Sequence, residues 1–207
     1  MDFPPKRGEG FSEAAWASCA KGLLYRLIPR EKTLIDKVRI EIVPDEKPFA
    51  EAESSSKTIY ISEGRLILFE NEVEFAALLG HELGHIKYNH YSVVSHAYTT
   101  APGMGPQIFF WVMWRFGQFL GIRPFSQTFE EYLFEIETRK EMQADEFMAR
   151  SLPPELNAAS IFADTLERFM RTSGMLDTPD EPCARMHRAR IACLRKLEQE
   201  NNTRAPH

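Results

Sequence analysis

The chain has 207 residues, of which 43% are hydrophobic and 27% charged, and its composition is that of a globular protein with one substantial core. Its formal net charge of −5 gives no electrostatic basis for binding nucleic acid, so no nucleic-acid partner is expected. The three cysteines form no CxxC pair, which argues against a disulfide framework and for a reducing compartment.

The first half of the chain predicts a helix followed by two short strands. The N-terminus lacks the basic-then-apolar layout of a signal peptide, so a cytoplasmic location is expected. Residues 13–28 fit an amphipathic helix, and alternating apolar and polar residues predict strands over 38–43 and 58–62. The polar, serine-bearing stretch 51–57 between the strands is expected to be an exposed loop.

The most informative stretch is HELGH at residues 81–85, inside a helix predicted over about 72–88. Residues four apart share one face of a helix, so His81 and His85 can bind one tetrahedral Zn²⁺ together. Glu82 would lie beside the metal without ligating it and could accept the proton of an activated water. Gly84 would let a neighbouring element approach closely. The bland alternative is a helix that carries two surface histidines.

The second half of the chain is predominantly helical. The run Phe109–Leu120 is too short to span a bilayer, and it fits a core helix with one polar face or a helix that contacts a membrane surface or partner. A capping box at 128–131 opens a helix that Pro153 and Pro154 stop. Further helices are predicted over 158–171 and 184–198.

A catalytic zinc that is bound by two histidines needs a third protein ligand. His90 is half a turn out of phase with His81 if the helix continues, and His96 has no special claim. Glu141 is better placed, because Asp145 follows one helical turn later and could accept a hydrogen bond from a ligand. Solvated Glu/Asp pairs are common on helices, however, so the residues alone leave this choice open.

The motif HELGH together with Glu141-x-x-Ala144-Asp145 resembles the HtpX-type and CAAX-prenyl-endopeptidase-type gluzincins, whose zinc site is HExxH plus a glutamate in an ExxxD motif. The resemblance also includes the strand at 58–62 and the helix entry at 74–80. It implies that His81, His85 and Glu141 bind Zn²⁺, that Glu82 is the general base, and that Asp145 supports the ligands.

The same resemblance implies the fold class and the domain limits. We expect an α+β, mainly helical, zincin-like domain over residues 35–198, with a small sheet edge beside the active-site helix. A helical segment (1–34) would precede it and a frayed tail (199–207) would follow. Many relatives carry transmembrane helices that are absent here, so a soluble member is expected, cytoplasmic or peripheral to a membrane.

The chain departs from the family pattern near its C-terminus. Relatives carry His-Pro followed by an arginine to which oxyanion stabilisation is ascribed, whereas this chain has Glu181-Pro182. His187 and Arg188 straddle the position of that arginine, so His187 first and Arg188 second are predicted to stabilise the oxyanion.

These motifs predict a zinc-dependent endopeptidase that acts on peptide or protein substrates, with the substrate strand pairing along residues 58–62. An ImmA/IrrE-type metallopeptidase that cleaves a repressor is a second interpretation, although the separation of His85 and Glu141 is long for it. A non-catalytic, zinc-stabilised binding module is a third. The oligomeric state is left open by the sequence.

Overall fold

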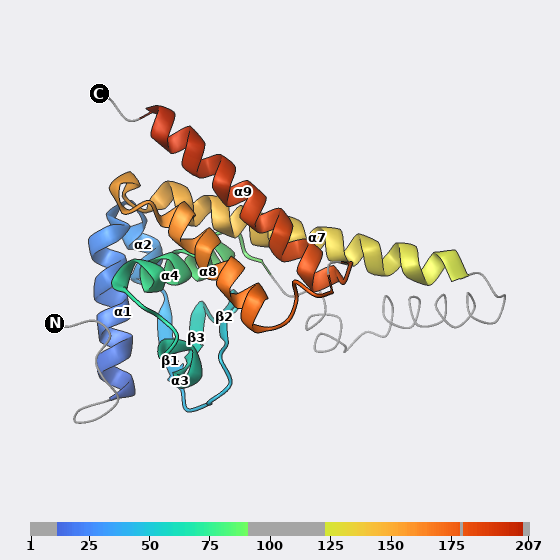
Figure 1. The fold of residues 1–207 in the computed structure, drawn as a ribbon. Coiled ribbons are helices and arrows are strands. Elements are labelled where there is room, and N and C mark those ends of the chain that lie inside the picture. The colour runs from blue at the N-terminus through green and yellow to red at the C-terminus, as the bar shows by residue number, and fades with distance from the viewer. Residues whose placement is uncertain (1–11, 91–122, 179, 205–207) are drawn as a thin grey trace.

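The structure is a computed structural model that describes residues 12–90, 123–178 and 180–204. His96 and the run Phe109–Leu120 lie outside these residues, so the predictions made for them stay predictions. The described part is mainly helical and contains one three-stranded sheet, which confirms the predicted α+β fold class (Figure 1). None of its helices has the length and apolar character needed to cross a membrane.

In chain order the elements are α1 (Glu13–Leu27), η1 (Pro29–Glu31), α2 (Lys32–Ile35), β1 (Arg39–Val43), β2 (Ala50–Glu53), β3 (Thr58–Ser62), α3 (Glu63–Leu66), α4 (Glu72–Lys87), α7 (Arg123–Ser151), η2 (Pro154–Leu156), α8 (Ala158–Thr172) and α9 (Pro182–Arg204). Figure 1 shows the long helices α7 and α9 across one end of the molecule and the sheet at the other, with α4 between α7 and the sheet and α1 along the side, next to α4.

The sheet has the strand order β1-β3-β2, with β1 parallel and β2 antiparallel to β3. The prediction that residues 51–57 form an exposed loop is wrong for its first part, because Ala50–Glu53 form β2. Two alanines alternate with two glutamates in this strand, and the alanines alone pack on the core. Since β3 is paired on both sides, it cannot also accept a substrate strand, and the expected pairing along residues 58–62 is corrected.

Helix α4 is the centre of the core and begins where its sequence predicts. The Asn71 side chain accepts hydrogen bonds from the backbone N–H groups of Val73 and Glu74, both at 3.0 Å, which caps the helix. Most of its residues are buried, and Phe75 contacts Trp16 of α1 edge to face at a centroid distance of 5.7 Å. Burial on all sides makes α4 a rigid support for the side chains that it presents to the site.

Two helix boundaries differ from those predicted. Helix α7 begins at Arg123, before the capping box at 128–131. Pro124 falls in its first turn, where a backbone N–H would have no partner within the helix, so proline is tolerated there. Helix α9 continues to Arg204, beyond the predicted end at residue 198, so the first part of the tail predicted over 199–207 is helical. Polar residues alone do not end a helix, and the next strong stop signal in the sequence is Pro206.

Candidate metal centre and active site

The structure brings His81 and His85 of α4 against Glu141 of α7. The two Nε2 atoms lie 3.1 Å apart, His81 Nε2 lies 3.4 Å from Glu141 Oε2, and His85 Nε2 lies 3.3 Å from Glu141 Oε1. In a tetrahedral site with bonds of roughly 2.0–2.2 Å to zinc, neighbouring ligand atoms are separated by roughly 3.3–3.6 Å. The three donors therefore have the types and spacing that could hold one metal ion.

Glu141 can approach the two histidines because α4 packs closely on α7. This close packing depends on Gly84. A Cβ atom at Gly84 would lie 2.9 Å from the Cα and 3.1 Å from the carbonyl oxygen of Ala144, which is closer than a side chain tolerates. The expectation that Gly84 admits a neighbouring element is confirmed. The residue of α7 that packs on Gly84 is Ala144, which lies between Glu141 and Asp145 in the sequence. The contact therefore sets how far along α4 the two carboxylates lie, beside the histidines.

Asp145 lies behind His81 and is fully buried. Its Oδ1 is 2.8 Å from His81 Nδ1, so the imidazole can donate to the carboxylate through Nδ1 and keep Nε2 directed at Glu141. Burial and Arg190 lower the pKa of His81, but Asp145 and Glu141 outweigh them and raise it to about 9. In the metal-free protein His81 is therefore protonated at neutral pH, and a metal ion at Nε2 would replace that proton.

Arg190 of α9 joins the carboxylates into one cluster. Its Nε and Nη2 atoms donate to the two oxygens of Asp145, both at 2.8 Å, and its Nη1 atom lies 2.7 Å from Glu141 Oε2. Burial would raise the pKa of Asp145, but Arg190 and His81 hold it down at about 2. Burial likewise opposes ionisation of Glu141, and His81, His85 and Arg190 keep its pKa well below the usual value. Both carboxylates are thus ionised at neutral pH.

Arg190 was not among the predicted site residues, although the sequence held a signal for it. The buried positions of α9 are Ala184, His187, Arg190, Leu194 and Leu197, which recur every three or four residues. An arginine on the apolar face of an amphipathic helix requires a buried anionic partner. The spacing from Pro182 favours His187 and Arg188, whereas the inward-facing positions of the helix favour His187 and Arg190.

A cavity of about 790 Å³ opens in front of the histidines. It is lined by Glu82, by the three candidate ligands, by residues of β2 and by the apolar side chains of Leu78, Phe162, Leu166 and Phe169. Glu82 is 5% exposed and lies on the cavity wall, one residue after His81. The arrangement places a carboxylate beside the candidate metal position, in a space large enough for an extended peptide segment.

The structure separates the two residues predicted to stabilise an oxyanion. His187 lines the cavity, is 8% exposed, and its Nδ1 atom has no hydrogen-bond partner. Burial and Arg190 lower its pKa to about 4, so the imidazole is neutral near pH 7. Arg188 is exposed on the other side of α9 and does not line the cavity, so the geometry offers no role for it at the metal position.

His90 lies outside the ligand group, on the far side of His85 from Glu141. Its Nδ1 atom is 3.1 Å from His85 Nδ1, and its Nε2 atom is 3.0 Å from Oε1 of Gln143. Helix α4 ends at Lys87, so the argument from helical phase does not extend to residue 90, and His90 lies outside the group of candidate ligands for a different reason: its ring contacts the far nitrogen of His85.

Two histidines and a glutamate on packed helices, with a further glutamate beside them in an open cavity, define a site of the metallopeptidase class. The chain belongs to peptidase family M48, whose family model matches residues 34–178. No curated protein and no solved structure matches the chain. Membership of this family identifies the protein as a metallopeptidase and favours the first of the two peptidase interpretations over the ImmA/IrrE type.

Proposed function

We propose that this protein is a zinc-dependent endopeptidase of the HtpX type, with His81, His85 and Glu141 as the metal ligands and Glu82 as the general base. The convergence of the His81, His85 and Glu141 side chains, whose ligand atoms approach to 3.1–3.4 Å on the wall of an open cavity, carries this proposal. Two imidazoles and one carboxylate form a common ligand set of catalytic zinc. The assignment to the HtpX type rests on the sequence motifs alone and belongs to the same proposal.

Different side chains would have different roles in the reaction. Zinc, when bound, would supply an activated water and polarise the scissile carbonyl. Glu82 would accept the proton from the attacking water and deliver it to the leaving amine. Asp145 and Arg190 would hold His81 and Glu141 in place through the hydrogen bonds described above.

His187 would donate a hydrogen bond to the oxyanion of the tetrahedral intermediate. Its unpartnered Nδ1 atom and its position on the cavity wall support this role. Its lowered pKa of about 4 means that the donor would be the N–H of a neutral imidazole. An imidazole on the cavity wall with an unpartnered ring nitrogen is available to a group that forms only during the reaction.

The substrate would bind along β2. Residues 50–53 line the cavity, and among the described strands only β3 pairs with β2. An extended substrate could therefore add a strand at the open edge of β2, using main-chain hydrogen bonds that do not depend on its sequence. This edge takes the place of the one predicted along residues 58–62.

A cleavage assay with casein or a peptide library tests the proposal. Turnover should be abolished by a chelator, restored by Zn²⁺, and lost in Glu82→Gln, which should still bind metal. Glu72→Gln is a matched control, because Glu72 is exposed in the first turn of the same helix, where it pairs with Arg26. A wild-type protein that binds zinc stoichiometrically but cleaves neither substrate would support the zinc-stabilised binding module instead.

A further inference from the structure

Helix α4 ends in a tight turn, and this turn brings His90 back toward the site. Asn89 adopts the left-handed conformation, with φ of 55°. The N–H of His90 donates to the carbonyl of His85 at 2.9 Å, and the N–H of Asn89 donates to that of Ile86 at 3.2 Å. This pair of hydrogen bonds is a Schellman motif, for which asparagine is one of the two favoured residues. His90 is therefore placed by backbone geometry and not by a continuing helix.

Two contacts hold this turn in place, one to its backbone and one to the His90 ring. The Ser54 hydroxyl lies 3.1 Å from the carbonyl oxygen of His85 and 2.8 Å from that of His90, and Ser54 is buried. The Tyr88 ring stacks on the imidazole of His90 at a centroid distance of 5.7 Å. Both contacts limit the positions that the His90 ring can take.

The two short contacts of His90 fix the direction of its hydrogen bonds. The side-chain oxygen of Gln143 can only accept, so a neutral His90 carries its proton on Nε2 and its Nδ1 atom must accept from Nδ1–H of His85, which leaves His85 Nε2 free to bind a metal. The Nε2–H of His90 donates to the Gln143 oxygen. The chain of donors runs from the candidate ligand, through His90, to helix α7.

We propose that His90 is a positioning residue that holds His85 in the tautomer and ring orientation required for metal binding, with Gln143 orienting His90 in turn. This inference rests on the proposed metal site. Asp145 receives the Nδ1–H of His81, and among the described residues His90 is the group that serves His85 in the same way. Partners of this kind raise the basicity of a ligating imidazole and reduce the freedom that it loses on binding.

The geometry distinguishes this role from that of a fourth ligand. The His90 ring contacts the nitrogen of His85 that points away from Glu141, and the group of donor atoms that could share a metal consists of His81, His85 and Glu141. The side chain of His85 is also more exposed than that of His81, at 13% against 6%. The ligand nearer to solvent therefore depends on a partner for its orientation.

Metal affinity of the full chain, measured by competition with a chromophoric chelator, tests the inference without relying on turnover. His90→Phe keeps a ring for Tyr88 and removes the acceptor, so we expect roughly 10–100-fold weaker zinc binding, the usual cost of losing a partner of a ligand. The visible spectrum of the Co²⁺-loaded variant should also change. His90→Gln restores an acceptor and should recover most of the affinity.

Two further variants separate positioning from loss of the turn. Gln143→Leu leaves the turn intact and should weaken zinc binding by a smaller factor than His90→Phe. Lys87→Ala removes an exposed ion pair with Glu31 at the same end of α4 and should leave the affinity unchanged. Thermal unfolding of each metal-free variant verifies that the fold is retained.

The outcomes are distinct. If His90→Phe binds zinc as tightly as wild type and gives the same Co²⁺ spectrum, the positioning role is overturned while the proposed function stands. If His90→Phe and His90→Gln lose the same affinity and Gln143→Leu loses none, the ring acts only as packing and the inference is also overturned. If the wild-type protein binds neither metal, it is the proposed function that fails.

Discussion

Replacing Arg190 by methionine should destabilise the metal-free protein strongly. The guanidinium is 5% exposed, makes two 2.8 Å hydrogen bonds to the buried Asp145 and contacts Glu141 at 2.7 Å. Methionine preserves the apolar contact with the ring of Phe162, over which the guanidinium carbon lies 5.7 Å from the centroid. The substitution therefore removes the charge and its hydrogen bonds while keeping the packing, and leaving Asp145 with His81 as its one remaining cationic neighbour costs up to about 3–5 kcal/mol.

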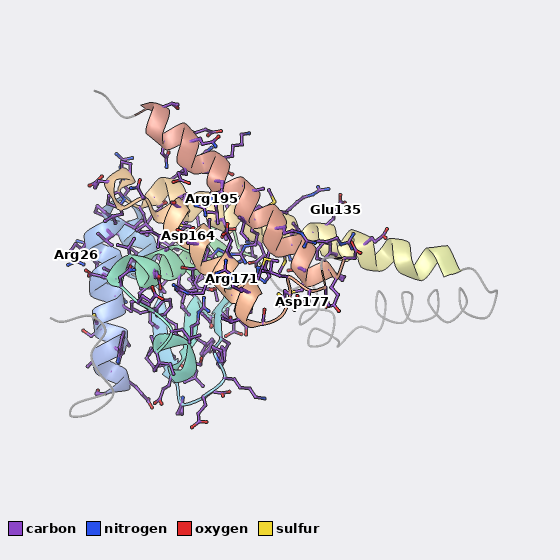
Figure 2. All side chains as sticks on the ribbon, viewed as in Figure 1. Arg26, Glu135, Asp164, Arg171, Asp177 and Arg195 are labelled. Carbon is purple, nitrogen blue, oxygen red and sulfur yellow. The ribbon has the colours of Figure 1, made fainter. Side chains whose placement is uncertain are left out.

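Arg195→Met provides a matched control on the same helix. Arg195 pairs with Asp164 and Glu167 of α8, but its side chain is 35% exposed. Figure 2 labels Arg195 and Asp164 where α9 passes α8. Exposed ion pairs contribute at most about 1 kcal/mol, so this variant should be nearly as stable as wild type. Arg190→Lys should fall between the two, because it keeps the charge and loses the two-point bond to Asp145.

Urea unfolding of the metal-free proteins at pH 7, followed by circular dichroism, gives the unfolding free energies. The reasoning is refuted if Arg190→Met and Arg195→Met differ by less than about 1 kcal/mol with equal denaturant slopes. Such a result would mean that Asp145 is stabilised by other groups and that Arg190 is not the organising cation of the cluster.

Three further predictions follow from the site. The pKa of Asp145 is lowered from 3.8 to about 2, so the ionised carboxylate stabilises the fold by about 2 kcal/mol above about pH 4 and this contribution is lost as the pH falls through 2. The acid unfolding curve of Asp145→Asn should lack this component. His187→Ala should retain zinc and substrate affinity but lose at least about tenfold in kcat, and an unchanged kcat would remove His187 from the oxyanion site. Gly84→Ala should push α7 away from α4, lowering both the melting temperature and zinc affinity; unchanged values would show that the helices adjust without cost.

The sequence predicts the central helix of this fold well, because the signals in that region agree with one another. Asn71 supplies a cap, the apolar residues follow a helical period, and the HExxH spacing places two imidazoles on one face. The resulting prediction of residues 72–88 differs from the structure by one residue. The pairing of Glu141 with these histidines came from the family resemblance, since two helices far apart in sequence meet only through tertiary packing.

The sequence does not predict strand β2, the position of His90 or the role of Arg190, because these depend on backbone geometry and packing that residue types alone indicate weakly. Strand β2 contains two alanines and two glutamates, so its alternation is too faint to distinguish it from a polar loop. The position of His90 depends on Asn89 adopting a positive φ, which turns the chain back after Lys87. Arg190 lies on the buried face of α9. An arginine is normally predicted to be on the surface unless its carboxylate partners, here Asp145 and Glu141, are known.

The central claim is that His81, His85 and Glu141 share one zinc ion. A crystal structure of the protein grown with Zn²⁺, with anomalous diffraction recorded on both sides of the zinc absorption edge, tests it most directly. The account predicts one strong anomalous peak per chain, roughly 2.0–2.2 Å from His81 Nε2, His85 Nε2 and a Glu141 oxygen, with Glu82 outside bonding distance. A peak ligated by Glu82 or His90, or no peak between α4 and α7, would contradict it.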